Sequence, residues 1–207
     1  MVNNCPKIMI KVIIFDLGNV IVNVNKTKQF KRFSADSNKS ISYIKNYFEN
    51  SYLRKAFERG GFNSEEFYDK VSNGLNLKMN FNNFKEAWCN IFSINKTIEK
   101  LIRTLKSDFK LVLLSNTDEM HFEYIKNKYR IVNEFDEYAL SYKVGYRKPN
   151  PIIFLNAIIK ANALPFNCVY FDDIPEFVYV ARLMGIRAFQ YKNFERLVDD
   201  LRKLKIL

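Results

Sequence analysis

The chain has 207 residues, of which 48% are hydrophobic and 15% aromatic, with only 6 glycines and 5 prolines. This composition excludes a disordered chain, a collagen-like repeat and a low-complexity array, and the length suits one domain with a modest insertion. The 33 basic and 22 acidic residues leave a formal charge of +11, but the lysines and arginines are scattered without a block of five. We therefore do not expect nucleic acid as a partner, whereas an anionic small molecule would benefit from the same field.

Cysteine usage and hydropathy indicate the compartment. Cys5, Cys89 and Cys168 are too widely spaced for a disulfide framework or a zinc knuckle. No apolar run approaches the ~18 residues that cross a bilayer, and the opening residues are too polar for a secretory signal. We expect a cytoplasmic globular protein without membrane contact, as a monomer or homodimer, in which residues 1–8 are a dispensable tail.

The first predicted element is a buried strand at residues 11–15, an apolar run that ends abruptly at Asp16. Residues 26–95 then contain no convincing strand. They instead predict aromatic-rich helices, at 27–33, 40–59, 64–73 and 80–92. We expect Ser64 to cap the third helix, because two glutamates follow it in the first turn. This segment is therefore predicted to be a helical insertion after the first strand.

Beyond the insertion, strands and helices alternate. Strands are predicted at 109–114, 137–141, 168–171 and 187–189, and helices at 97–106, 152–161 and 176–184, the last ended by Gly185. The alternation predicts an α/β fold, a three-layer Rossmann-like parallel sheet covered by helices on both faces. Active sites in such sheets lie beyond the carboxyl ends of the strands. Asp16, Ser115 and the pair Asp172–Asp173 all follow strands, so we expect these side chains to converge.

Four sequence blocks occupy these strand ends and helix starts: IIFDLGNVIV at 13–22, LLSNT at 113–117, VGYRKPNPIIF at 144–154 and YFDD at 170–173. In this order they resemble the haloacid dehalogenase-like (HAD) hydrolase superfamily over residues 11–190. D-L-G-N-V is similar to the opening of a branch that includes glucose 1-phosphate phosphatases. The helical insertion resembles the α-helical cap of the first subclass. The resemblance thus implies a core of residues 1–25 and 96–207 and a cap domain of residues 26–95.

The resemblance implies a Mg²⁺-dependent phosphatase that forms an aspartyl-phosphate on Asp16. The implied metal ligands are Asp16, the backbone carbonyl of Gly18 and Asp173, while Asp172 ligates or orients a metal-bound water. Two like charges meet when a carboxylate approaches a phosphate, so a divalent cation with hard oxygen ligands is required. The expected substrate is a small phosphorylated metabolite, with sugar phosphates favoured by the resemblance.

The remaining implied site residues bind phosphate or the leaving group. Ser115 and the backbone amides of the following residues, Asn116 and Thr117, would hold phosphoryl oxygens, and Lys148 would neutralise the charge on phosphate and nucleophile. In the insertion, residues 56–67 resemble the E-R-G cap element of the same branch. Glu58, Arg59 and Arg54 are therefore candidates to reach substrate hydroxyls or phosphate.

Departures from the family pattern keep alternatives open. Gly18 stands where most phosphatases of the superfamily place a general acid–base Asp, and Phe177 stands where the branch often has Asn. A catalytically weak member that binds a ligand or nucleic acid is therefore the alternative. A 2-haloacid dehalogenase is less favoured, because the Asp172–Asp173 pair is hard to justify without a cation. The single histidine, His121, excludes a histidine-based metal cluster and is expected to lie at the surface or in packing.

Overall fold

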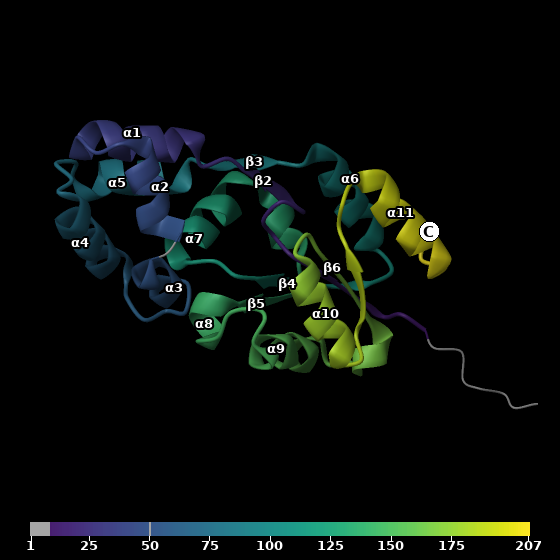
Figure 1. Ribbon diagram of the computed structural model, residues 1–207. Helices are drawn as coiled ribbons and strands as arrows, with labels where there is room; N and C mark the ends of the chain where they lie inside the picture. Colours follow the sequence, from purple (N-terminus) through teal and green to yellow (C-terminus); the bar gives the residue numbers. More distant parts are fainter. Residues whose placement is uncertain (1–8, 50) are drawn as a thin grey trace, which may run out of the picture.

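The computed structural model describes residues 9–49 and 51–207 (Figure 1). The predicted dispensable tail, residues 1–8, lies outside the described residues. The main sheet has five parallel strands, in the spatial order β5 (Glu137–Leu140), β4 (Lys110–Ser115), β1 (Val12–Phe15), β6 (Cys168–Asp172) and β7 (Arg187–Gln190). All five predicted strands are present, and the predicted α/β fold is confirmed.

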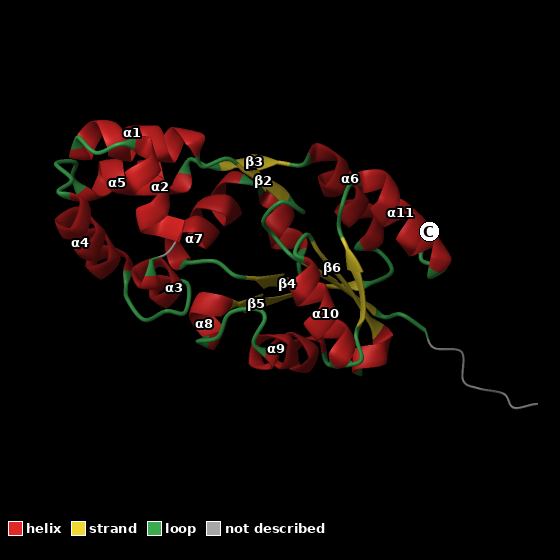
Figure 2. Ribbon diagram, in the orientation of Figure 1, coloured by secondary structure: helices red, strands yellow, loops and turns green. Residues whose placement is uncertain are grey.

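Helices cover both faces of this sheet (Figures 1 and 2). Because strand side chains alternate, Ile13 and Phe15 of β1 face one layer while Val12 and Ile14 face the other. The first layer contains α6 (Lys96–Leu105), α7 (Glu119–Lys128) and α11 (Phe194–Lys203), and the second contains α9 (Pro151–Ala161) and α10 (Pro175–Leu183). The short elements are α8 (Ser141–Val144), η1 (Arg130–Glu134) and η2 (Pro165–Asn167). Helix α11 was not among the elements predicted from the sequence.

A separate helical unit lies beside the sheet. Its helices are α1 (Thr27–Ser37), α2 (Ile41–Glu49), α3 (Tyr52–Phe57), α4 (Ser64–Leu75) and α5 (Phe81–Cys89). They pack around an aromatic core in which Phe57 stacks on Phe67 at 4.1 Å and Phe33 stacks on Phe84 at 5.4 Å between ring centroids. Aromatic rings bury large areas and prefer such offset contacts, so these helices share one aromatic cluster, which also includes Met120 of α7.

Three local predictions for this unit were wrong. Residues 40–59 contain two helices, α2 and α3, and Ser51 begins the second by accepting a hydrogen bond from the Arg54 amide. Residues 26–95 do contain a strand, β3 (Phe92–Ile94), which pairs antiparallel with β2 (Val22–Val24) and is too short to show periodicity. The cap of α4 is Asn63 rather than Ser64, in a reciprocal capping box with Glu66.

One close approach joins the helical unit to the sheet-bearing part. Gly60, just beyond α3, has a φ of 73°, and a Cβ at this position would collide with the backbone carbonyl of Tyr142 in α8. Only glycine adopts this conformation without strain and also leaves room for the carbonyl. Gly60 therefore sets the position of the end of α3, which carries Glu58.

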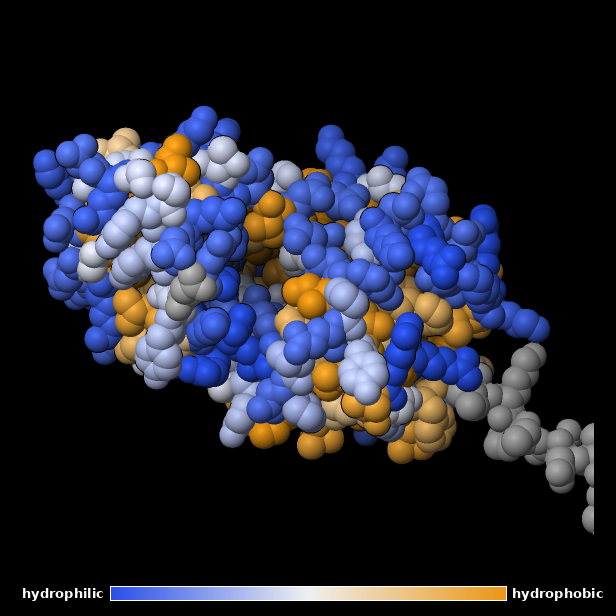
Figure 3. Space-filling model, viewed as in Figure 1, coloured by the Kyte–Doolittle hydropathy of each residue, from blue (hydrophilic) through white to orange (hydrophobic). Residues whose placement is uncertain are grey.

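Large hydrophobic side chains are exposed on α9 and α10: Ile152, Leu155 and Ile159 in α9, and Tyr179 and Leu183 in α10. Orange residues gather along the lower edge of the molecule in Figure 3. Within the described residues, none of the helices combines the length and the apolar character needed to span a bilayer.

Candidate active site

The carboxyl ends of the three central strands bring the predicted site residues together. β1 lies between β4 and β6, with Phe15 opposite both Leu113 and Phe171. Asp16 follows directly, and its amide donates to the Phe171 carbonyl oxygen at 2.9 Å. Because the strands are parallel and in register, their polar terminal residues share one edge of the sheet. The predicted convergence of the strand-end residues Asp16, Ser115, Asp172 and Asp173 is thereby observed.

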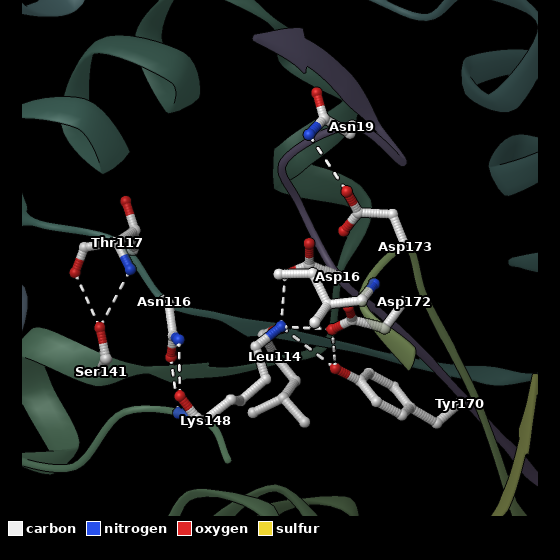
Figure 4. A network of polar contacts seen from close by, with 11 residues as sticks. Asp16, Asn19, Leu114, Asn116, Thr117, Ser141, Lys148, Tyr170, Asp172 and Asp173 are labelled. Carbon is white, nitrogen blue, oxygen red and sulfur yellow. Dashed lines mark hydrogen bonds and ion pairs between the residues drawn. The ribbon is translucent and has the colours of Figure 1, made fainter. Parts of the chain in front are cut away.

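Lys148 lies at the centre of a buried polar network (Figure 4). Its Nζ donates to Asp16 Oδ1 and Asp172 Oδ2, both at 2.6 Å, and to the Leu114 carbonyl oxygen at 3.1 Å. Tyr170 also donates its hydroxyl to Asp172. The lysine is only 2% exposed, so its charge is compensated by two carboxylates rather than by water.

Burial and neighbouring charges shift the acidity of this network. Burial raises the pKa of Asp16 to about 7, although Lys148 opposes the rise and Asp172 adds to it. Burial would lower the pKa of Lys148, but the two carboxylates outweigh it and raise that pKa. Burial also raises the pKa of Asp173, an effect that the hydrogen bond from Asn19 reduces. The site therefore holds more carboxylate than its one lysine can neutralise.

Three carboxylates form a group that fits a metal ion. Asp16, Asp172 and Asp173 each offer one oxygen, and these oxygens lie within 4.8 Å of one another. Asp16 and Asp173 also line a cavity, as does Gly18. Asp172 is fully buried, with Oδ2 bound to Lys148 and Tyr170 and Oδ1 accepting from the Ile174 amide. The geometry therefore favours Asp172 as an orienting group behind the cavity wall.

Asn19 is a site residue that the sequence analysis missed. It has a φ of 56°, in the left-handed region that asparagine tolerates better than most residues. This conformation lets Nδ2 donate to Asp173 Oδ2 at 3.1 Å while Oδ1 accepts from the Val24 amide at 3.3 Å. Asn19 therefore fixes the orientation of a predicted metal ligand.

We expect Asn19→Gly to weaken the apparent Mg²⁺ affinity by about 10-fold, because groups that orient metal ligands contribute on this scale. Glycine keeps the left-handed backbone and removes the two side-chain hydrogen bonds, the one to Asp173 and the one from the Val24 amide. The matched control is Asn76→Gly, at a residue with the same φ of 56° at the end of α4. Magnesium titration by calorimetry measures both variants, and equal affinities in the two would contradict a role for Asn19.

In the segment that follows β4, several polar groups contact other residues of the site. Asn116 uses its side chain to hold Lys148, accepting from the Lys148 amide at 2.7 Å and donating to its carbonyl oxygen at 3.0 Å. The Thr117 amide donates to Ser141 Oγ at 3.0 Å. Both residues line the cavity, but these groups are already engaged there. Among the described residues the Ser115 hydroxyl has no hydrogen-bond partner, so it remains available to a ligand.

A cavity of about 530 Å³ lies between the strand ends and the helical unit. The helical unit contributes Arg54 and Glu58, whereas Arg59 is exposed and borders a different depression beside residues 145–150. Of the predicted cap residues, the structure therefore places Glu58 and Arg54 at the cavity and Arg59 outside it. A volume of this size is typical of a site for a small molecule.

Two aromatic contacts complete the cavity wall. Phe177 places its ring centroid 5.1 Å from Lys148 Nζ, a cation–π contact at the position where the sequence comparison expected asparagine. His121 stacks on Trp88 at 4.9 Å, and its Nδ1 lies 2.8 Å from Asp118 Oδ2. The expectation that His121 is a packing residue is confirmed, although it also borders the cavity.

A family model described as haloacid dehalogenase-like hydrolase matches residues 10–185. D-ribitol-5-phosphate phosphatase of Bacteroides thetaiotaomicron is 25% identical over 193 residues, which cover 89% of this chain and 93% of that protein. A HAD family enzyme from the same organism, crystallised with magnesium and inorganic phosphate, is similar with a TM-score of 0.82 and 25% identity over 91% of this chain and 98% of that chain. A HAD-like family hydrolase of Porphyromonas gingivalis has the same TM-score and identity, over 95% and 98% of the two chains. Since the family model spans most of its length, this chain belongs to the haloacid dehalogenase-like hydrolases.

Proposed function

We propose that this chain is a Mg²⁺-dependent phosphatase that hydrolyses a small phosphorylated metabolite, with sugar phosphates as the favoured class. The observation that carries the proposal is the group of three carboxylates, within 4.8 Å of one another and beside the buried Lys148. The related Bacteroides structure contains magnesium and inorganic phosphate, and the sequence relative is a ribitol 5-phosphate phosphatase. Both relatives support phosphate-ester chemistry at this site.

The carboxylate group fits a hard divalent cation, because Mg²⁺ prefers oxygen ligands. When ionised, Asp16, Asp172 and Asp173 exceed the single charge of Lys148 by two. We assign Asp16, Asp173 and the backbone carbonyl of Gly18 as ligands, with Asp172 holding the arrangement from behind. The cation supplies the positive charge that offsets repulsion between the nucleophile and the phosphate.

Asp16 is the proposed nucleophile. Its carboxylate attacks phosphorus, the phosphorus–oxygen ester bond breaks, and water later hydrolyses the aspartyl-phosphate. Lys148 holds Asp16 Oδ1 at 2.6 Å, which orients the carboxylate and offsets charge that builds up as phosphate arrives. Ser115 offers its hydroxyl to a phosphoryl oxygen. Asn116 acts indirectly, since its side chain holds the backbone of Lys148.

The charges at the site favour a phosphatase over a dehalogenase. Attack on a carbon–halogen bond requires no cation, so Asp172 and Asp173 would add uncompensated negative charge beside the nucleophile. Phosphoryl transfer requires a cation, and the same two carboxylates then help to hold it.

We further propose that residues 26–95 form a cap domain over a core of residues 1–25 and 96–207. The helices of this unit share one aromatic cluster and supply part of the cavity wall. The chain leaves and re-enters the core through the β2–β3 pair, so both connections run side by side. A site between such parts excludes bulk water and admits small substrates.

Hydrolysis of p-nitrophenyl phosphate and ribitol 5-phosphate tests the proposed function. We expect turnover with Mg²⁺ and a fall of about 10²-fold or more with EDTA, restored by excess Mg²⁺. A panel that adds glucose 1-phosphate and other sugar phosphates then tests the substrate class. Binding of these esters without hydrolysis of any of them would favour a catalytically weak binding protein instead.

A further inference from the structure

The cavity wall formed by the helical unit carries a different charge balance from the strand ends. Lys26 immediately precedes α1, Arg54 lies in α3, and Arg147 comes from the core segment before Lys148. These three cations, which we name the basic wall, share the cavity with Glu58. Lys26, Arg54 and Glu58 also border a small adjoining recess that none of the three aspartates lines. The basic wall thus extends away from the site of phosphate chemistry.

Glu58 is shared between two arginines. Its Oε1 lies 3.0 Å from Arg54 NH1, and its Oε2 lies 2.5 Å from Arg147 Nε. The contact with Arg147 is an ion pair by distance but lacks the angle of a hydrogen bond, and the buried Arg54 Nε has no hydrogen-bond partner among the described residues. The Glu58 carboxylate therefore contacts two guanidinium groups, and each of them retains an Nε without a hydrogen-bond partner among the described residues.

Lys26 is the third cation and the least compensated. It is half-buried, and within the described residues its ammonium group makes neither a hydrogen bond nor an ion pair. Burial lowers its pKa, Arg54 lowers it further, and Glu58 and Glu49 oppose this only in part. Glu49 is itself exposed and within 3.8 Å of Lys45. An anion that enters the cavity would stabilise the charged form of Lys26.

Charge at the two parts of the cavity differs in sign. The three aspartates exceed Lys148 by two negative charges, which a divalent cation offsets. The basic wall exceeds Glu58 by two positive charges, and the other two carboxylates that line the cavity, Asp16 and Asp173, belong to the group assigned to the divalent cation. Apolar neighbours, Ile91 and Phe92 among them, reduce the screening of these charges by water. With the phosphoryl group bound at the aspartates and the cation, a neutral leaving group would bring no anion to the basic wall.

We infer that the cavity selects phosphate monoesters whose leaving group carries a second anionic group, a carboxylate or a phosphate, which binds to Lys26, Arg54 and Arg147. This inference rests on the proposed phosphatase function and narrows its substrate class. Arginine binds both kinds of anion through paired N–H donors, and charge-assisted hydrogen bonds are among the strong ones. The basic wall thus determines specificity, while the aspartates and Lys148 perform the reaction.

A purely structural role is the competing explanation for the two arginines. Arg147 belongs to the core and Glu58 to the helical unit, so their ion pair also joins the two parts. That role does not involve Lys26, which has no ion pair in the described chain. Lys26 is therefore the residue that separates the two explanations.

Matched pairs of esters test the inference on the Mg²⁺-loaded protein. The first pair is 3-phosphoglycerate and glycerol 3-phosphate, which differ by a carboxylate, and the second is glucose 1,6-bisphosphate and glucose 1-phosphate, which differ by a phosphate. In at least one pair, we expect kcat/KM to be higher by about 10-fold or more for the ester whose leaving group carries the second anionic group. The pair with the larger ratio identifies the anion.

Lys26→Gln is expected to reduce that preference at least about 5-fold, because it removes one charge-assisted contact. Lys28→Gln, at an exposed residue two positions after Lys26 in the first turn of α1, is the matched control and should leave the ratio unchanged. An equal or higher kcat/KM for the ester with the neutral leaving group, in both pairs, would overturn the inference. A preference that survives Lys26→Gln undiminished would overturn it as well.

Failure of the proposed function gives a different result. If neither these four esters nor the panel described above is hydrolysed, the phosphatase proposal fails, and the intact esters then serve as ligands for calorimetry on the same protein. Tighter Kd values for the charged members, reduced by Lys26→Gln, would support an anion-selective cavity. Equal Kd values within each pair would overturn the inference independently of turnover.

Discussion

The Asp16→Asn variant is expected to lose phosphate-ester turnover by a factor of about 10⁴ or more, because the amide cannot act as the nucleophile. Its residual rate should also no longer involve a covalent phosphoenzyme. Rapid quenching with a radiolabelled phosphate ester measures this directly, since label attached to the protein should be found in the wild-type chain and be absent from the variant. Steady-state hydrolysis of p-nitrophenyl phosphate gives the accompanying rate.

The control for Asp16→Asn is Asp199→Asn, which makes the same chemical change at an exposed residue of α11. It should leave turnover and labelling at the wild-type level. Retention of a labelled phosphoenzyme in Asp16→Asn would show that another group attacks phosphorus, even if turnover were slow.

Lys148→Met is expected to lower the free energy of unfolding of the metal-free protein by about 3–5 kcal/mol, the scale seen when one partner of a buried ion pair is removed. The substitution leaves Asp16 and Asp172 without the Nζ that lies 2.6 Å from each of them. Added Mg²⁺ should recover part of the loss, because the cation binds the native carboxylate group and not the unfolded chain. Urea unfolding with and without Mg²⁺ measures both effects.

The loss should depend on pH in a defined direction. Burial already raises the pKa of Asp16 to about 7, and removal of Lys148 takes away the charge that opposes the rise. When a carboxyl group has a higher pKa in the folded protein than in the unfolded chain, the free energy of unfolding falls as pH rises from the unfolded-state pKa to the folded-state pKa. Lys148→Met should therefore be more destabilising near pH 8 than near pH 5.

Lys143→Met, at an exposed lysine in α8, is the control for this stability measurement. It should change the free energy of unfolding by no more than about 0.5 kcal/mol. Equal stability of the two variants would indicate that Lys148 contributes no net stabilisation to the network.

Strong local patterns made most of the sheet predictable from the sequence. The β-branched run before Asp16 and the apolar run before Ser115 are long enough to indicate buried strands, and each became a strand of the parallel sheet. Parallel order then requires that their ends share one edge, so the position of the candidate active site was predictable as well. Strand β3 was not predictable, because its three residues are too few for an alternating pattern to be recognised.

Capping was predictable in kind but not always in position. Asn63 and Ser64 are adjacent residues that both favour an N-cap, and the backbone angles of the folded chain assigned the role to Asn63. The role of Asn19 was likewise not predictable from neighbouring residues. Its left-handed backbone belongs to a turn, and its side chain donates to Asp173, which is 154 residues away in the sequence. The residues next to Asn19 in the sequence do not indicate that Asp173 is its partner.

The fold class, the position of the proposed nucleophile and the group of carboxylates could be predicted from local sequence patterns, because each depends on residues within one strand and its turn. Three further relations became visible only in the folded chain: Asn116 and Ser141 hold other site segments, Arg59 lies outside the cavity, and Lys26, Arg54 and Arg147 share one wall. Those relations join segments far apart in the chain. Their energies come from distance, burial and charge compensation, which exist only once the chain has folded.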